Sequence, residues 1–485
     1  MMKFCGIIRV YRLLKTPVYK EYFSGTNTKL TGDPPLFVSG SYDAPMSEIP
    51  AAPSTSTNRR KIITKPVLAW ASWDWGSAAI NAVMTTFVFT VYLTSDLFGN
   101  KDANSVVLGN GLAIAGVAIA LLAPVTGLRS DAGGRRRFWL GVNTVIVALL
   151  TAACFFVFPE PRFLVLGVTL IALASVFSEF AAVNYNAMLP QISTPSTIGK
   201  VSGFGWGMGY LGGILALAIV LFTLVTPIFD WAGASDANSL NLRLVAVFSA
   251  VWFMGFGLPV LFAVPEIPGD PGGPRFTILQ SYKELWRRVV ALAHADRHTV
   301  YFLFASAVFR DGLAAVFTFG GIIAAGTFGF PLQQVIIFAI VGNVVAAAGA
   351  MVGGMLDDRI GPKRVIVISL VGLLVAGLGV FFSPEASGFW IFGLLLCLFV
   401  GPAQASSRAF LARLAPAGQE GELFGLYATT GRAVSFLAPA LFAASIALAT
   451  PHVAEAQRYG ILGILVVLLL GLLLLIPVRG PRTST

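Results

Sequence analysis

Residues 127–137 read Gly127-Leu-Arg-Ser-Asp131-Ala-Gly-Gly134-Arg-Arg136-Arg137, and residues 354–364 read Gly354-Met-Leu-Asp-Asp358-Arg-Ile-Gly361-Pro-Lys363-Arg364. A glycine, an aspartate, a second glycine and a basic pair fall at identical offsets in the two stretches. Each stretch lies between two long apolar segments, so the chain contains a duplicated unit of several helices. A duplication of this kind is typical of transporters that move two helical bundles about a central site.

The apolar segments on either side of these stretches predict the fold class. A membrane-spanning helix needs about 20 mostly apolar residues. Twelve segments qualify: 66–95, 105–128, 137–158, 162–188, 200–226, 241–264, 298–326, 332–355, 364–382, 387–412, 422–447 and 457–478. The sequence therefore predicts an all-α membrane protein whose twelve transmembrane helices form two six-helix bundles.

The overall composition excludes several other classes of protein. Of the 485 residues, 56% are hydrophobic and only 12% are charged, and the mean hydropathy is +0.79. A typical soluble domain has about twice that charged fraction, so a cytosolic enzyme is excluded. The three cysteines and three histidines lack metal-ligand spacing, and we expect neither a metal nor a cofactor.

The polar ends of the chain are expected to be tails. Residues 1–65 are polar and hold ten Lys and Arg, which predicts a disordered basic N-terminal tail; Met46 is an alternative start. Residues 66–264 and 298–478 are the two expected bundles, and residues 479–485 form a short C-terminal tail.

The connection between the bundles, residues 265–297, is the longest interior loop. Charged residues within it alternate with apolar ones that recur at helical spacing: Leu279, Tyr282, Trp286, Val289 and Ala293. This pattern predicts an amphipathic cytoplasmic helix that lies on the membrane surface.

Lys and Arg are distributed unevenly across the predicted membrane. With a cytoplasmic N-terminus, 27 of the 33 lie on the cytoplasmic side, four lie outside, and Arg310 and Arg432 lie within spans. Because basic residues favour cytoplasmic loops, both termini are predicted to be cytoplasmic. The net charge of +10 is then explained by topology, and no basic patch remains to bind nucleic acid.

The repeated stretch resembles the motif that joins helices 2–3 and 8–9 in the major facilitator superfamily. Five further motifs are similar to the signature of the vacuole-effluxer-like (autophagy-related permease) family: Ala69-Trp70-Ala-Ser-Trp73-Asp74-Trp75, Tyr185-Asn186-Ala187-Met188-Leu189-Pro190, Arg310-Asp311-Gly312, Gln404-Ala-Ser-Ser-Arg408 and Gly431-Arg432. The resemblance covers about residues 66–478. It implies a carrier whose eukaryotic relatives export amino acids from the vacuole. For a bacterial-type member it implies a multi-pass protein of the plasma membrane that functions as a monomer.

Five ionisable side chains lie within the predicted spans, namely Asp74, Glu179, Arg310, Asp311 and Arg432. A charge in hydrocarbon costs roughly 2.5–3.5 kcal/mol on insertion scales, so each is a functional candidate. Counting about 1.5 Å per residue along each helix places all but Asp74 near the middle of the bilayer, where central substrate sites lie.

Each predicted role follows from the chemistry of the side chain. Arginines bind carboxylates, so Arg310 and Arg432 are predicted to bind the substrate. The further predicted substrate contacts are Asn81, Tyr185, Asn186 and Gln404. Glu179, Asp311 or Asp74 is predicted to carry a coupling proton. The alternative is that these charges form structural ion pairs between the bundles, with Asp74 as a latch near the cytoplasmic end.

The repeated stretch is predicted to form a gate. Asp131 and Asp358 are each expected to accept hydrogen bonds from the N-terminus of a neighbouring helix and from an arginine, which locks the outward-facing state. The other members of this gating loop are Gly127, Gly134, Arg136, Arg137, Gly354, Gly361, Lys363 and Arg364. Separately, the glycines of 203–213 predict close helix packing.

These features together predict a secondary active transporter that works by alternating access and is not an enzyme. We expect proton coupling and a small polar or zwitterionic solute such as an amino acid. A drug or metabolite efflux antiporter of the same fold remains the alternative. A membrane-embedded enzyme is disfavoured because the three histidines lie outside the spans.

Overall fold

The computed structural model describes residues 62–228, 235, 237–267, 277–453 and 456–479. Within this part of the chain, twelve helices are long and apolar enough to cross a membrane, which confirms the predicted number of spans. Residues 1–61 and 480–485 of the predicted tails, and residues 268–276 of the predicted connection 265–297, lie outside the described residues.

The N-terminal half begins where Thr64 caps the first helix, its side chain accepting a hydrogen bond from the backbone N–H of Val67 at 3.4 Å. The elements of this half are α2 (Lys65–Ala79), the π-helix η2 (Ile80–Phe87), α3 (Phe89–Leu93), α4 (Lys101–Gly133), α5 (Arg136–Ala153), α6 (Leu164–Ala187), α7 (Leu189–Ile192), α8 (Ile198–Val220), α9 (Leu240–Gly257) and α10 (Pro259–Ala263).

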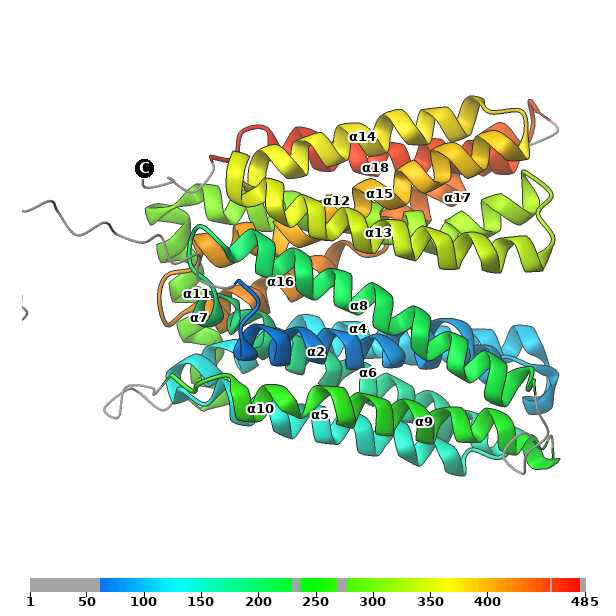
Figure 1. The fold of residues 1–485 in the computed structure, drawn as a ribbon, viewed down its shortest axis with the longest axis horizontal. Coiled ribbons are helices and arrows are strands. Elements are labelled where there is room, and N and C mark those ends of the chain that lie inside the picture. The colour runs from blue at the N-terminus through cyan, green and yellow to red at the C-terminus, as the bar shows by residue number, and fades with distance from the viewer. Residues whose placement is uncertain (1–61, 229–234, 236, 268–276, 454–455, 480–485) are drawn as a thin grey trace, which may run out of the picture. The chain divides into compact units, whose positions relative to one another are not determined.

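The C-terminal half follows a linker helix, α11 (Ile278–Ala295). Its elements are α12 (Arg297–Gly326), α13 (Leu332–Ile360), α14 (Pro362–Phe382), α15 (Ala386–Leu414), α16 (Glu420–Val434), α17 (Leu437–Ala449) and α18 (Gly460–Leu475). The two halves meet where α8 packs against α13 and α4 packs against α16 (Figure 1). We call the end of the helices that carries α11 the linker end, and the other the opposite end.

The apolar outer surface fits a lipid environment. Phe262, Phe382 and Leu448 each expose more than 70% of their surface, and many other large apolar side chains on the described helices are exposed. Exposed apolar patches of this extent are unusual on a soluble monomer, whereas hydrocarbon solvates them. The small residues lie inside, where the helices cross.

The repeated stretches are mostly helical, and the prediction that they form loops is wrong. Gly127 and Asp131 lie within α4, and Gly354 and Asp358 lie within α13, because both helices continue beyond their predicted ends. The chain turns only at the second glycine of each copy. Gly134 has φ +56° and Gly361 has φ +88°, a left-handed conformation that favours glycine.

The first glycine of each copy permits contact between the two halves. A Cβ on Gly354 would collide with the carbonyl oxygen of Gly199, and one on Gly127 would collide with that of Gly421. Gly203 of α8 meets the Ala350 carbonyl of α13 in the same way. Both contacts join one half to the other at the linker end, so backbone packs directly on backbone there.

We therefore expect Gly354→Val to open the linker end. Overpacking costs roughly 1–3 kcal/mol, so the closed population should fall about 5- to 150-fold relative to the open one. Spin labels on Ser196 and Ala417, exposed turn residues of the two halves, would report this as longer distances. Gly116→Val is the matched control, since a Cβ there meets nothing within 4 Å. Identical distance distributions for the two variants would contradict the prediction.

The linker helix α11 is bound to both halves. Thr277 and Gln280 form a capping box at its start, and the Tyr282 hydroxyl donates to the Leu121 carbonyl of α4 at 3.0 Å. Leu279 and Trp286 are 81% and 72% exposed, facing away from the other helices. The amphipathic pattern thus forms a helix, and its location on the membrane surface stays a prediction.

Candidate functional site

Two ion pairs join the two halves within the predicted spans, and the one farther from the linker end is partly exposed. The Arg432 guanidinium of α16 donates to Oε2 of Glu179 of α6 at 3.2 Å. Their side chains remain 42% and 26% exposed, although each lies near the middle of its predicted span. A single partly exposed contact of this kind leaves most of the hydrogen-bonding capacity of both groups available to a solute.

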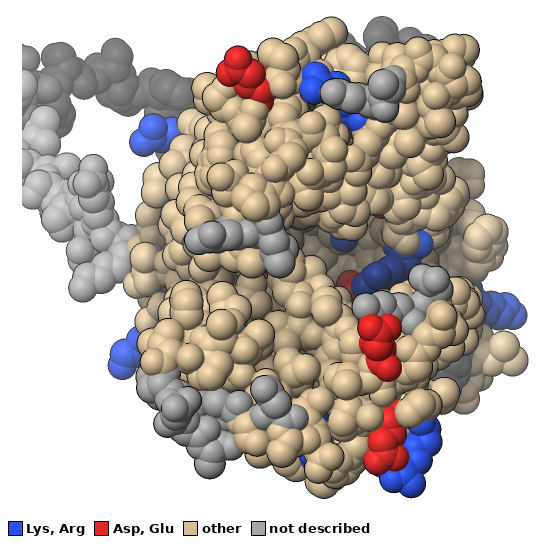
Figure 2. Space-filling view, turned by 90° about the vertical axis from the view of Figure 1, so that its right-hand side faces the viewer, with Lys and Arg blue, Asp and Glu red and all other residues tan. Residues whose placement is uncertain are grey.

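The opposite end of the protein is hollowed between the two halves. Figure 2 shows this face, with Lys or Arg atoms and a smaller patch of Asp or Glu atoms inside the opening. The partial exposure of Arg432 and Glu179 agrees with an opening between α6 and α16. At the linker end, by contrast, the contacts between the halves exclude solvent.

The helix that carries Arg432 is interrupted. α16 ends at Val434 and α17 begins at Leu437, so this span consists of two half-helices. Arg432 lies in the last turn of α16, where the helix dipole favours a cation. Asp311 of α12 accepts a hydrogen bond from the backbone N–H of Ala438 at 2.7 Å, and therefore caps the start of α17. Discontinuous helices mark substrate sites in many transporters.

Arg310 is placed differently from its neighbour Asp311. Its guanidinium lies 3.6 Å from the ring centroid of Tyr427 and donates to the Tyr427 carbonyl at 3.3 Å. The consecutive residues thus point to different partners. No carboxylate lies within ion-pair distance of Arg310 among the residues that the structure describes.

A second group of polar residues lies nearer the linker end. Arg408 of α15 is nearly buried, and its guanidinium donates to Oδ2 of Asp74 at 3.1 Å and to Oδ1 of Asn186 at 3.4 Å. It also donates to the side chain and carbonyl of Ser202, at 3.0 and 2.7 Å. The Tyr185 hydroxyl completes the set with a 2.8 Å hydrogen bond to Asp74.

Aromatic rings surround this guanidinium. Its central carbon lies 4.8 Å from the ring of Trp70, 5.8 Å from that of Tyr185 and 5.6 Å from that of Trp206. Tyr185 is stacked between Trp70 and Trp73, with both centroid distances 4.4 Å. We call this set the aromatic pocket; its members are Trp70, Asp74, Tyr185, Asn186, Ser202 and Trp206. All six belong to the N-terminal half, and Arg408 belongs to the other.

Arg408 is one of the 27 basic residues that the sequence predicts on the cytoplasmic side, and this prediction of a surface charge is wrong. Arg408 lies inside α15, which continues to Leu414, and only 6% of its side chain is exposed. Counting loop charges treated it as a topology signal because it lies near a helix end. Its occurrence in the Gln404-Ala-Ser-Ser-Arg408 motif was the signal that could have identified it.

The first copy of the repeated motif connects α4 to α16. Asp131 accepts backbone hydrogen bonds from Gly421 at 3.1 Å and Glu422 at 2.8 Å, at the N-terminus of α16. Arg136 binds Asp131 within its own half and Glu420 of the other, both at 2.6 Å. One aspartate and one arginine therefore hold the N-terminus of α16 against the N-terminal half.

The second copy connects α13 to α8. Asp358 accepts backbone hydrogen bonds from Gly199 at 2.8 Å and Lys200 at 3.0 Å, at the N-terminus of α8. Arg413 of α15 binds both Asp358, at 2.9 Å, and Asp357. The two contacts are related by the same duplication that relates the two stretches of sequence.

The linker helix takes part in the first contact. Arg288 of α11 donates to Glu422 of α16 at 2.9 Å and to Glu284 at 2.8 Å. Hydrogen bonds from Arg287 and Arg288 lower the pKa of Glu284 below its ordinary value. Because Glu422 also donates its backbone N–H to Asp131, the linker is coupled directly to the contact between the halves.

The other basic residues of the motif bind within their own halves. Arg137 lies 3.4 Å from Glu266, Lys363 donates to the Ile476 carbonyl at 2.7 Å, and Arg364 is exposed. Of the remaining predicted substrate contacts, Asn81 is exposed in η2 and Gln404 is half-buried one turn before Arg408. Tyr92, which follows the π-helix η2 in the same span, lies in a buried apolar cluster.

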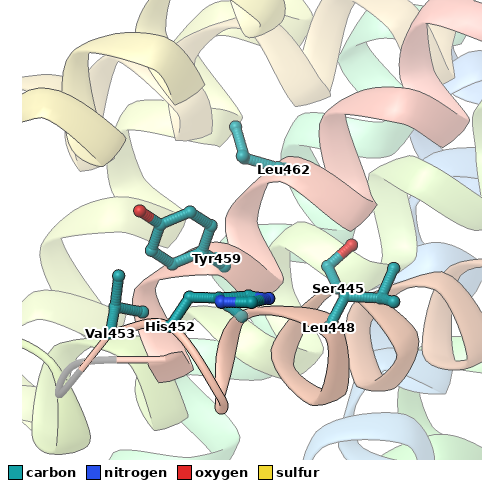
Figure 3. Close-up of a pocket in the computed structure, with 7 residues that line it drawn as sticks. Ser445, Leu448, His452, Val453, Tyr459 and Leu462 are labelled. Atoms are coloured by element: carbon teal, nitrogen blue, oxygen red, sulfur yellow. The ribbon is translucent and has the colours of Figure 1, made fainter.

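A separate hollow of about 320 Å³ lies where α17 ends and α18 begins. Figure 3 shows Ser445, His452 and Tyr459 among its lining residues. It contains neither an ion pair nor a residue of the groups described above. Among the described residues, no group of three or more His, Cys, Asp or Glu is placed to hold a metal ion.

Comparison with protein families gives a match over about 60% of the chain. The model of the vacuole effluxer Atg22-like family matches residues 195–484. The chain is 27% identical over 397 residues to the uncharacterized MFS-type transporter YxiO of Bacillus subtilis, covering 79% of this chain and 89% of that protein. It is 24% identical over 316 residues to autophagy-related protein 22-1 of Neosartorya fischeri, covering 59% of this chain and about half (49%) of that protein.

Solved structures match in fold over most of the chain. The proton:xylose symporter XylE aligns with a TM-score of 0.64 and 13% identity, covering 86% of this chain and 96% of that one. A bacterial homologue of the iron transporter ferroportin, in an outward-facing state, aligns with a TM-score of 0.62 and 15% identity, covering 86% and 98%. At these identities the likeness concerns the fold alone.

Proposed function

The chain belongs to the vacuole effluxer Atg22-like family of the major facilitator superfamily, and from that premise we propose that it exchanges a zwitterionic solute for protons. An amino acid is the simplest solute of this class. Alternating access between the two halves carries the solute across the membrane, and one chain suffices for the cycle.

The observation that carries this proposal is the segregation of charge between the two halves. Among the ionisable side chains that lie away from the ends of the spans, Asp74 and Glu179 belong to the N-terminal half, and Arg310, Arg408 and Arg432 belong to the C-terminal half. Asp311 is the exception, and its carboxylate caps α17. A zwitterion fits this arrangement because its ammonium group faces the carboxylates while its carboxylate faces the arginines.

The Glu179–Arg432 pair is the first binding site for the solute in this proposal. The ammonium group of the solute takes the place of Arg432 at Glu179, and the carboxylate of the solute binds Arg432. Arg310 lies in the same half and is a further cation, with no carboxylate partner among the described residues. A proton on Glu179 removes the charge that attracts the ammonium group. Proton and solute therefore compete for one carboxylate, which is the chemistry of an exchanger.

The direction of the opening follows from the distribution of basic residues. The linker end carries most of the Lys and Arg outside the spans, so we assign it to the cytoplasm of a bacterial cell, with both termini inside. The closed linker end and the hollow at the opposite end then correspond to an outward-facing state.

Reconstituted vesicles test this proposal. We expect a labelled zwitterionic amino acid to accumulate against its gradient when the pH differs across the membrane. Acidification of the side that binds solute should raise KM, because the proton competes for Glu179. A dicarboxylate and a diamine of similar size are matched controls, and both should exchange at least tenfold more slowly. Failure of every amino acid to move would overturn the proposed substrate class.

A further inference from the structure

The aromatic pocket binds a cation that comes from the other half of the protein. The guanidinium of Arg408 lies among three aromatic rings, at 4.8–5.8 Å, and donates to Asp74, Asn186 and Ser202. Carboxylates and aromatic faces together are the elements that recognise ammonium and guanidinium groups.

The contact with Arg408 cannot persist through a transport cycle. The pocket residues lie on α2, α6 and α8, whereas Arg408 lies on α15 of the other half. Opening the linker end separates the halves and withdraws the guanidinium. Asp74 would then remain as an uncompensated carboxylate within the protein, which costs several kcal/mol.

A proton on Asp74 compensates only part of this loss. It neutralises the carboxylate, but it does not replace the cation that contacts the rings of Trp70 and Trp206 and donates to Asn186 and Ser202. A small organic cation satisfies the carboxylate, the neutral acceptors and the rings together. The composition of the pocket therefore favours a cationic group over a proton.

We propose that the aromatic pocket is a binding site for the ammonium or guanidinium group of the solute, which Arg408 occupies as an internal ligand while the linker end is closed. This inference rests on the proposed function and adds a second binding site for the solute. Asn186 and Glu179 lie seven residues apart on α6, about 10 Å along the helix axis. The ammonium group passes from Glu179 to Asp74 as Arg408 leaves.

The test uses the full chain with Arg408→Ala and methylguanidinium as the probe. We expect methylguanidinium to stabilise this variant saturably against heat, and to have at least fivefold less effect on the wild-type protein, whose pocket is filled. Methylurea is the matched probe, with the same shape and no charge, and should give no stabilisation. Asp74→Asn added to Arg408→Ala should abolish the effect of methylguanidinium.

Equal responses to methylguanidinium and methylurea, or no saturable response in the variant, would overturn the inference. If Arg408→Ala does not fold, Asp74→Asn alone supplies the test, because it should raise KM for an ammonium-bearing solute at least tenfold. An unchanged KM would overturn the inference in that case. Binding of methylguanidinium by Arg408→Ala in a protein that moves no amino acid would support the pocket and reject only the proposed function.

Discussion

Arg432→Ala is expected to lower kcat/KM for the transported solute by at least about 30-fold. Removing one partner of a charged contact between two binding surfaces costs about 2–5 kcal/mol, and each 1.4 kcal/mol is a factor of ten. The Arg432 side chain is 42% exposed and binds Glu179 at a single distance of 3.2 Å, and an exposed pair of this kind stabilises a fold by only about 0–1 kcal/mol. Initial rates of counterflow in vesicles measure the effect.

Two further variants separate solute binding from a structural role of this pair. Arg432→Gln combined with Glu179→Gln removes both charges and keeps the shapes of the side chains. If the pair only joins the halves, this double variant should transport almost normally, and that result would contradict the prediction. Arg162→Ala is the control for loss of an arginine, because its pair with Glu160 is exposed and is worth about 0–1 kcal/mol.

The fold could be predicted from the sequence because hydrocarbon imposes a simple rule. Every span must be about 20 apolar residues long, so each transmembrane helix is visible in the sequence as an apolar segment between polar ones. The predicted spans end before α4 and α13 do, because charged residues such as Asp131 and Asp358 are typical of loops. Their charges are tolerated inside helices because each binds the N-terminus of another helix.

The pairing of side chains could not be predicted in the same way. Arg310 and Asp311 are adjacent in sequence, yet one packs on Tyr427 and the other caps α17. The break between α16 and α17 is signalled by Pro439, which lacks the N–H that would bond the Ser435 carbonyl, but this signal does not reveal that Asp311 caps the new helix. Which charges meet depends on how the two halves pack, and neither the lengths of apolar segments nor the spacing of motifs specifies that packing.

Arg408 illustrates the same limit at the closed end. Its distance along the chain from a helix terminus suggested a surface charge, but six residues of another half enclose it. A basic residue near the end of a span can either mark the cytoplasmic side of the membrane or bind a buried partner. Only the position of Asp74 across the interface distinguishes them.

Asp131→Ala combined with Asp358→Ala is expected to shift the protein from the closed to the open linker end. Each aspartate caps a helix of the opposite half through two backbone N–H groups, and loss of one cap costs about 0.5–2 kcal/mol. The sites lie in separate contacts, so their effects should add. A sum of about 1–4 kcal/mol favours the open state by roughly 5- to 1000-fold.

Spin labels on Ser196 and Ala417 measure this shift at the linker end, and labels on Glu160 and Ala386 should report closure of the opposite end. Asp296→Ala is the matched control, because Asp296 caps α12 through the backbone N–H of His298 without joining the two halves. It should lower thermal stability by a comparable amount and leave both distances unchanged. The double variant should also transport more slowly, since a carrier held open on one side completes fewer cycles. Unchanged distances in the double variant would mean that the glycine contacts and Arg408 close this end without the aspartates.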